Sequence, residues 1–314
     1  MFITGDLPIV AEKQLKKAGF TVKINRNQKQ LTKAELISGA KNADAVISLL
    51  SNKIDMEVID CLSKCRVIAN YAVGYNNIDL EYARKKNIIV TNTPDVLTDA
   101  TADIAMGLIL AVTRRFYESE KLVRDKKFVG WQPKLLLGSS LQNKTLGIIG
   151  AGRIGYATAL RAKAFGMKII YFSRSRNEDF DEKLNAKKVS LPKLMNAADV
   201  ISLHLPLNER TKNIVNSKML DLMKSSSVLI NTARGEVLNE IHLIKLLKKK
   251  KIFGAGFDVY QNEPELNNEL LKLENVYLLP HIGSATIEAR NQMAEIAAQN
   301  VINVLNGKKP ITPV

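Results

Sequence analysis

Short apolar runs alternate with amphipathic stretches along the first ninety residues or so, and this pattern predicts repeated strand–helix units. The runs expected to be strands are 2–4, 20–24, 45–50, 67–69 and 88–90. The stretches with apolar residues at helical spacing are 9–17, 33–38, 56–62 and 80–86. Strands separated by helices form parallel sheets, so this part predicts a small doubly wound α/β domain.

The same alternation returns in the second half of the chain. The runs expected to be strands there are 145–149, 167–172, 199–203, 227–231, 252–257 and 276–279. A closing helix at 285–305 is expected to return to the first domain. The predicted fold class is therefore α/β, with two doubly wound parallel-sheet domains and a cleft between them. We expect one domain to comprise residues 1–97 plus 286–314 and the other residues 98–285.

One long helix is expected to run from about residue 98 towards residue 124. Its small or apolar residues at helical spacing are Ala105, Leu108, Ile109 and Val112. They predict a buried packing face, which we also expect to form part of a homodimer contact. Trp131, the single tryptophan, follows in a loop flanked by glycine and proline. It is either a packing anchor or an apolar wall of a binding site.

A glycine-rich turn follows the apolar run at 145–149 directly, and a helical stretch follows the turn. The first glycine allows a tight turn, the second lets the backbone approach a pyrophosphate, and the third lets the helix pack on the sheet. Free N–H groups at the helix start would face the phosphate charge. This context predicts a Rossmann dinucleotide-binding domain. The residues expected to contact the cofactor here are Gly150, Gly152, Arg153, Ile154 and Gly155.

The end of the next strand indicates which dinucleotide binds. An NAD site usually has a carboxylate about 20 residues after the glycines, where it binds the ribose hydroxyls. Here Ser173, Arg174, Ser175 and Arg176 occupy that place, and no acid occurs until Glu178. Guanidinium and hydroxyl groups suit a 2′-phosphate, so we predict NADP(H), with NAD(H) as the alternative cofactor. Solvated loop arginines without a ligand are the competing interpretation.

The charge balance is strongly basic, with 46 lysines and arginines against 31 acids and a net charge of +15. The lysines are scattered, and the dense run at 248–251 follows an apolar helix whose C-terminal dipole favours cations. No element that reads bases accompanies the charge, so we expect no nucleic-acid partner. A positive field would still attract an anionic substrate and cofactor.

The remaining composition favours a cytoplasmic protein. No uncharged apolar stretch reaches 18 residues, and the N-terminus lacks the pattern of a signal peptide, so we expect no membrane association. Cys61 and Cys65 lie one helical turn apart, where a disulfide would have poor geometry, so both read as reduced thiols. No paired ligand spacing predicts a metal site.

Three ionisable residues follow separate predicted strands in the second half: Arg234, Glu263 and His281. Histidine is a natural proton donor near neutral pH, and a neighbouring carboxylate favours its charged form. Arginine can bind a substrate carboxylate and polarise the adjacent carbonyl. His242 and His204 are weaker candidates for the proton donor. In the first half, Gly74 either exposes consecutive N–H groups to an anion or only makes a turn.

At these residues the chain resembles the D-isomer-specific 2-hydroxyacid dehydrogenases. The resemblance lies in segments 73–79, 232–235, 262–264 and 280–286 and in the glycine turn, and it covers essentially the whole chain. Within the family, the chain is most similar to the NADP-dependent glyoxylate/hydroxypyruvate reductases. Asn76 departs from the aspartate that is common at its position. The resemblance implies a flavodoxin-like substrate domain beside the Rossmann domain.

The resemblance also implies roles for single residues. His281 would be the general acid, Glu263 would hold its proton, and Arg234 would bind the substrate with the N–H groups of Val73 and Gly74. Trp131 would reach the substrate pocket of a partner subunit in a homodimer. The 2′-phosphate would lie at Ser173, Arg174 and Ser175. The other residues expected at the cofactor are Leu205, Pro206, Thr232, Ala233, Asp258 and Gly283.

Together with these residues, the resemblance implies NADPH-dependent reduction of glyoxylate or hydroxypyruvate to the D-2-hydroxy acid. Reduction of another 2-oxo acid with NADH, such as 2-ketogluconate, pyruvate or phosphohydroxypyruvate, is the alternative within the same class. Phosphite dehydrogenation is a further alternative. A nucleotide-sensing interaction protein of the corepressor type is the alternative from another class, since a fold does not by itself determine function.

Overall fold

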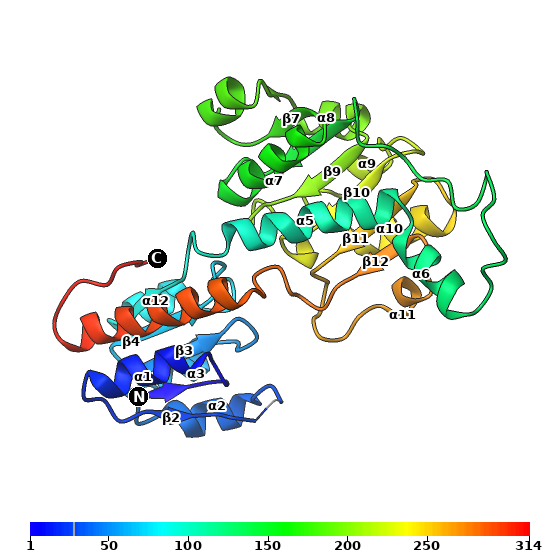
Figure 1. Cartoon of the computed structure of the whole chain (residues 1–314). Coiled ribbons are helices and arrows are strands. Elements are labelled where there is room, and N and C mark those ends of the chain that lie inside the picture. Colours follow the sequence, from blue (N-terminus) through cyan, green and yellow to red (C-terminus); the bar gives the residue numbers. More distant parts are fainter. Residues whose placement is uncertain (28) are drawn as a thin grey trace. The chain divides into compact units, whose positions relative to one another are not determined.

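The computed structural model describes residues 1–27 and 29–314, which form two compact units (Figure 1). Met1–Leu97 and Ser284–Val314 make up the first unit, and Thr98–Gly283 makes up the second. The second unit thus ends at Gly283, where the sequence led us to expect 285. Two parallel sheets confirm the predicted α/β class.

The first unit contains a five-stranded parallel sheet with the order β2-β1-β3-β4-β5. Its strands are β1 (Phe2–Ile3), β2 (Lys23–Ile24), β3 (Ala45–Leu49), β4 (Val67–Tyr71) and β5 (Ile89–Thr91). Its helices are α1 (Ile9–Lys17), α2 (Lys33–Ala40), α3 (Met56–Asp60), α4 (Leu80–Lys85) and α12 (Ile287–Leu305). This strand order is the flavodoxin-like one.

Polar caps at the ends of loops explain where these helices begin. Thr32 forms a reciprocal capping box with Glu35 at the start of α2. The side chains of Asp55, Asp79 and Thr286 accept N–H groups from the first turns of α3, α4 and α12. Such caps satisfy N–H groups that a helix cannot pair internally, so they locate helix starts in the sequence.

The second unit contains a seven-stranded parallel sheet with the order β12-β11-β10-β9-β6-β7-β8. Its strands are β6 (Thr145–Ile149), β7 (Lys168–Phe172), β8 (Lys187–Lys188), β9 (Val200–Leu203), β10 (Val228–Asn231), β11 (Gly254–Phe257) and β12 (Val276–Leu278). Its α-helices are α5 (Thr98–Thr113), α6 (Phe116–Arg124), α7 (Arg153–Ala164), α8 (Leu191–Ala197), α9 (Ser217–Leu220), α10 (Glu240–Lys248) and α11 (Asn268–Leu271), with short turns η1 (Asp179–Lys183) and η2 (Gly235–Val237). The order reverses between β6 and β9, as in a Rossmann sheet.

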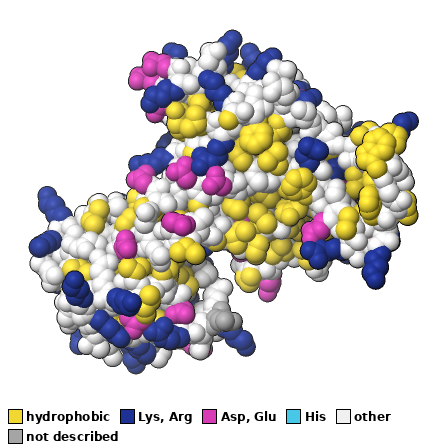
Figure 2. Space-filling view, viewed as in Figure 1, with side chains coloured by type: hydrophobic (Ala, Val, Ile, Leu, Met, Phe, Trp, Pro, Cys, Tyr) yellow, Lys and Arg dark blue, Asp and Glu magenta, His cyan; other side chains and the backbone are white. Residues whose placement is uncertain are grey.

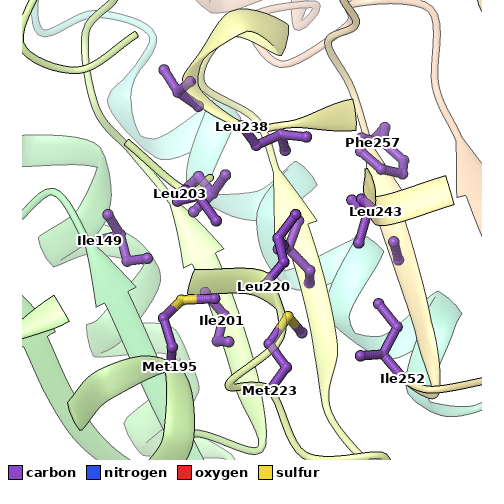
Figure 3. Packing of buried hydrophobic residues seen from close by; sticks show 14 of the residues in the cluster. Ile149, Met195, Ile201, Leu203, Leu220, Met223, Leu238, Leu243, Ile252 and Phe257 are labelled. Carbon is purple, nitrogen blue, oxygen red and sulfur yellow. The ribbon is translucent and has the colours of Figure 1, made fainter. Parts of the chain in front are cut away.

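The core on one face of this sheet explains why its strands read as continuous apolar runs. Side chains of β6, β9 and β11 pack against α8, α9 and α10 (Figure 3). Met195 and Met223 fill the space between helices and strands, and Leu243 lies near Phe257. Strands buried on both faces carry no polar alternation, so apolar runs between glycine-rich turns predict them well.

The prediction of one helix from 98 to 124 is wrong, because the first helix ends at Thr113. Arg115 has a left-handed backbone (φ 56°), and α6 starts after it in a new direction. The N–H of Ser139 donates to the carbonyl of Thr113 at 2.9 Å, and a Cβ on Gly138 would lie 2.3 Å from that oxygen. Residues 138 and 139 therefore occupy the space at the end of α5 that a further helical turn would fill. No glycine or proline near Thr113 marks this break in the sequence.

The apolar residues expected on this helix lie inside the unit. Ala105, Leu108, Ile109 and Val112 are at most 6% exposed, and α5 packs on β10, β11, β12 and α7. Buried side chains cannot form a surface contact, so these four residues do not supply the predicted dimer interface.

Candidate active site

The glycine turn lies at the point where the strand order of the second unit reverses. Gly150 has a φ of 106°, and a Cβ on it would lie 2.5 Å from the carbonyl oxygen of His204, which follows β9. A Cβ on Gly155 would lie 2.3 Å from the carbonyl oxygen of Gly150. Only glycine fits these two positions, so the loops after β6 and β9 meet in backbone contact. Leu205 and Pro206 continue the β9 loop.

The start of α7 is built to receive an anion. Gly152 is its N-cap, no side chain caps the helix, and its first turn, which includes Arg153 and Ile154, carries no acid. A Cβ on Gly152 would meet no described atom within 4 Å, so the space over the N–H groups is open. A helix of 12 residues offers such N–H groups and a favourable dipole to phosphate. The turn therefore fits a dinucleotide pyrophosphate.

Two buried polar atoms at neighbouring strand ends have no hydrogen-bond partner among the described residues. They are Oγ1 of Thr232, after β10, and Nδ1 of His204, after β9. Burial lowers the pKa of His204 to about 3, so its ring is neutral, and Ser202 Oγ lies 2.8 Å from its Nε2. Unpaired buried polar groups are costly, so this edge of the sheet fits a polar ligand that would pair with them.

The loop after β7 is attached to the glycine turn. Asn177 donates from Nδ2 to the carbonyl of Ala151 at 2.8 Å. The hydroxyl of Ser173 donates to the carbonyl of Ser175, and the Lys188 ammonium donates to the carbonyl of Arg174 at 3.0 Å. Sequence analysis missed Asn177 and Lys188, because nothing local marks an asparagine that bonds 26 residues away.

The two arginines expected at a 2′-phosphate differ in their surroundings. Arg176 forms an ion pair with Asp181, which also accepts the hydroxyl of Tyr171 at 2.9 Å. Arg174 is exposed. Arg176 already has an anionic partner, so only Arg174 of the two arginines remains a candidate for binding the 2′-phosphate.

The candidate acid and its partner carboxylate are in direct contact. His281 Nδ1 lies 2.7 Å from Glu263 Oε2, and the other Glu263 oxygen accepts the N–H of Tyr260 at 2.8 Å. Burial raises the pKa of Glu263, but the hydrogen bond and charge of His281, the Tyr260 N–H and the charge of Arg234 together lower it below its usual value. The carboxylate is therefore ionised near neutral pH and places a negative charge against the imidazole ring.

Asp258, at the end of β11, holds the turn that carries His281. Its two oxygens accept the N–H groups of Ile282 and Gly283, each at 2.7 Å. His281 itself has a left-handed backbone (φ 55°), and a Cβ on Gly283 would lie 2.9 Å from Asp258 Oδ2. Burial raises the pKa of Asp258, and the two N–H groups and the charge of His281 oppose that rise. Asp258 thus positions His281, a role that sequence analysis did not find.

The loop after β10 carries Arg234 and contacts the loop of Glu263 through its backbone. The Asn231 side chain accepts the N–H of Ala233 at 3.0 Å and donates to the carbonyl of Arg234 at 2.9 Å. A Cβ on Gly235 would lie 2.0 Å from the carbonyl carbon of Tyr260. Burial lowers the pKa of Arg234, and the charges of Glu263 and Glu236 oppose this. The arginine therefore stays charged beside the histidine–glutamate pair.

The three remaining candidate residues are not in the strand-end loops of the second unit described above. Val73 and Gly74 follow β4 in the first unit. Trp131 lies between α6 and β6 and is 84% exposed, with exposed Phe128 and Val129 nearby in sequence. Figure 2 shows hydrophobic side chains on the surface over this segment.

Metal-binding clusters and membrane-spanning helices are both missing from residues 1–27 and 29–314. In that part of the chain, no group of three or more histidine, cysteine, aspartate or glutamate residues is arranged to hold a metal ion. No helix there is long and apolar enough to cross a membrane.

Comparison with known proteins agrees with this geometry. Residues 106–283 match the family described as "D-isomer specific 2-hydroxyacid dehydrogenase, NAD binding domain". Over 314 residues, the chain is 47% identical to a glyoxylate reductase of Thermococcus litoralis, covering 99% of this chain and 95% of that protein. The chain belongs to the D-isomer specific 2-hydroxyacid dehydrogenases. The predicted family and the prediction of an enzyme are therefore confirmed.

Solved structures support the same assignment of this dehydrogenase. A crystal structure of a protein from Thermus thermophilus has a TM-score of 0.94 and 42% identity and covers 100% of this chain and 99% of that one. An NADPH-dependent glyoxylate/hydroxypyruvate reductase of Sinorhizobium meliloti, solved with NADP and malonate, has a TM-score of 0.88 and 31% identity, covering 100% of this chain and 95% of that one. Relatives named for the reduction of 2-oxo acids thus share the whole fold.

Proposed function

We propose that this dehydrogenase reduces glyoxylate or hydroxypyruvate to the D-2-hydroxy acid with NADPH. The contact of 2.7 Å between His281 and Glu263 carries the proposal, because it joins a proton donor to a carboxylate beside a charged arginine. The name of the Thermococcus litoralis relative supports the substrate class. The open N-terminus of α7 supports a dinucleotide as the source of hydride.

A dinucleotide held by the glycine turn would supply the hydride that the carbonyl carbon of the 2-oxo acid needs. Because Glu263 occupies Nδ1 of His281, the Nε2–H faces the substrate and donates its proton to the carbonyl oxygen. Arg234 binds the substrate carboxylate and polarises the carbonyl, helped by the N–H groups of Val73 and Gly74. One hydride and one proton convert the carbonyl group into the alcohol.

The cofactor would be held by the residues of the second unit that face its sheet edge. The glycine turn and Arg153 would bind the pyrophosphate, and Ser173, Arg174 and Ser175 the 2′-phosphate. The nicotinamide end would lie along Thr232, Ala233, Asp258 and Gly283, with Leu205 and Pro206 along the ribose. The unpaired Thr232 hydroxyl and the absence of an acid between Phe172 and Glu178 support this arrangement.

We further propose that the enzyme is a homodimer in which Trp131 of the partner subunit reaches the substrate. Trp131 is 84% exposed in the single subunit, so its ring is not buried there. Contact with a partner subunit would remove this apolar surface from water. A monomeric mass in solution at micromolar protein concentration would refute the dimer.

The proposed substrate and cofactor are tested by initial rates at 340 nm with a panel of 2-oxo acids. We expect rapid oxidation of NADPH with glyoxylate and hydroxypyruvate, and a preference for NADPH over NADH of about ten- to a hundredfold, the worth of one or two charge-assisted contacts. Arg174→Ala should abolish most of this preference, whereas Arg176→Ala should not. A preference for NADH in the parent enzyme contradicts the cofactor assignment only. No activity with any 2-oxo acid contradicts the proposed reaction.

The proton relay predicts a pH-dependent effect of Glu263→Gln. The lowered pKa of Glu263 means that the carboxylate is ionised throughout the neutral range, where it stabilises the proton on His281. An amide has no charge to do so, hence the alkaline limb of the kcat profile for reduction should lie at lower pH than in the parent enzyme. Stopped-flow or steady-state rates between about pH 5 and about pH 10 measure the limb. An unchanged limb contradicts the role of Glu263.

A further inference from the structure

Three successive carbonyl groups in the loop after β4 are each held by a donor from the interior of the first unit. The carbonyl of Ala72 accepts the N–H of Thr93 at 2.9 Å. The carbonyl of Val73 accepts Nδ2 of Asn92 at 2.8 Å, and the carbonyl of Gly74 accepts Nδ2 of Asn70 at 2.8 Å. The orientation of three consecutive peptide planes is therefore determined by interior groups.

The geometry of the peptide bond then sets the direction of the N–H groups. In a trans peptide the N–H points opposite to the carbonyl of the preceding residue. The N–H groups of Val73, Gly74 and Tyr75 consequently point away from the donors that hold the three carbonyls. Among the described residues, none accepts a hydrogen bond from these three N–H groups. Successive N–H groups of this kind form a concave anion site.

The two asparagines are placed firmly enough to impose this orientation. Asn70 is fully buried and Asn92 is 8% exposed. Oδ1 of Asn70 accepts the hydroxyl of Ser48 at 3.0 Å and Nδ2 of Asn77 at 3.2 Å, so its Nδ2 is the end that faces Gly74. Asn77 in turn donates to the carbonyl of Asn52 at 3.1 Å. The partners of Asn70 and Asn77 thus define both amide orientations, and such a network is rigid. Asn92 is held through its backbone, which exchanges two hydrogen bonds with Thr312.

We propose that Asn92 and Asn70 are positioning residues of the substrate site. By holding the carbonyls of Val73 and Gly74, they direct the N–H groups of Gly74 and Tyr75 at the substrate carboxylate, and Tyr75 joins Val73 and Gly74 as a third backbone donor. This inference rests on the proposed reduction of a 2-oxo acid. It assigns to two buried amides the task of keeping the anion site formed before substrate binds.

Asn92→Asp tests the inference with a change of one functional group. The introduced carboxylate repels the Val73 carbonyl, so the peptide is free to turn its N–H away from the substrate. We expect KM for glyoxylate to rise about tenfold, the worth of one well-placed hydrogen bond to a charged group, with kcat within about twofold and KM for NADPH unchanged. The inhibition constant of oxamate, an unreactive analogue, should rise by the same factor.

The pH dependence separates positioning from general damage. A protonated carboxyl group can donate to the Val73 carbonyl as the amide does, so the KM ratio of Asn92→Asp to parent enzyme should fall as the pH is lowered. Asn70→Asp, which keeps the oxygen for Ser48 and Asn77 and loses the donor to Gly74, should raise KM in the same way. A loss of stability alone would change neither ratio with pH.

Asn275→Asp is the matched control, since Asn275 also donates from its side-chain amide to backbone carbonyls, those of Leu247 at 3.4 Å and Phe253 at 3.3 Å. It lies in the second unit and has no contact with Asn92, Asn70 or the loop after β4 among these bonds. Its KM values should stay at the parent level even where its thermal stability falls. Unchanged KM and oxamate inhibition in Asn92→Asp and Asn70→Asp overturn the inference. Failure of the parent enzyme to reduce any 2-oxo acid overturns the proposed function instead.

Discussion

We expect the His281→Gln enzyme to reduce 2-oxo acids about 10³-fold more slowly than the parent enzyme while binding NADPH equally well. Glutamine can still bond to Glu263 but has no proton to give at neutral pH. The developing alkoxide then depends on water, which is a far weaker acid than an imidazolium. Because His281 and the glycine turn are separate parts of the second unit, the loss should appear in kcat and not in the affinity for cofactor.

Single-turnover rates at 340 nm and titration of NADPH fluorescence measure the two quantities. His242→Gln is a matched control, since His242 Nε2 also contacts a carboxylate, that of Asp221, at 2.7 Å, but on the outer side of α10. The control should retain the parent kcat. A His281→Gln enzyme with full turnover would contradict the assignment of the acid.

Arg234→Lys should raise KM for glyoxylate by about a hundredfold and lower kcat as well. Lysine keeps the positive charge beside Glu263, but its ammonium cannot form two parallel hydrogen bonds to a carboxylate and reach the carbonyl as a guanidinium does. Loss of two charge-assisted hydrogen bonds costs about 3 kcal/mol, which corresponds to that factor. We expect a larger effect than for either asparagine, because the proposed role of Arg234 is to bind the substrate itself.

Steady-state kinetics with glyoxylate over a wide concentration range measures this change. Arg124→Lys, at an exposed arginine that pairs with Glu120, should leave KM and kcat unaltered. The alkaline limb of the pH profile should also stay in place in Arg234→Lys, because Glu263 keeps its contact with His281. A parent-like KM in Arg234→Lys would show that the arginine does not bind the substrate.

Much of the fold follows from the sequence because parallel strands buried on both faces leave apolar runs. The runs that became β3, β4 and β6 were predicted within one or two residues. The run at 20–24 was only partly right, since β2 pairs over Lys23–Ile24 alone at the sheet edge. The break after Thr113 was missed because its cause, the contact with residues 138 and 139, lies about two dozen residues away. Tertiary contacts of this kind leave no local pattern.

The candidate site shows the same division between local and distant information. Residue types at strand ends indicated Arg234, Glu263 and His281, but their mutual distances could not be read from sequence. The contact between His281 and Glu263 spans 18 residues and requires the left-handed backbone of His281. Asn177 and Asp258 bond to backbone atoms of other loops, and Asn231 bonds to the loop that directly follows it. Amides and carboxylates with that task look like ordinary loop residues in a sequence.

The hydrogen bonds of Asp258 to Ile282 and Gly283 lie at the point where the chain leaves the second unit. Gly283 is the last residue of that unit, and Ser284 already belongs to the first. The two N–H bonds therefore fix the backbone between His281 and the point where the chain leaves the second unit. One carboxylate after β11 thus sets the position of both the candidate proton donor and the last residue of the unit.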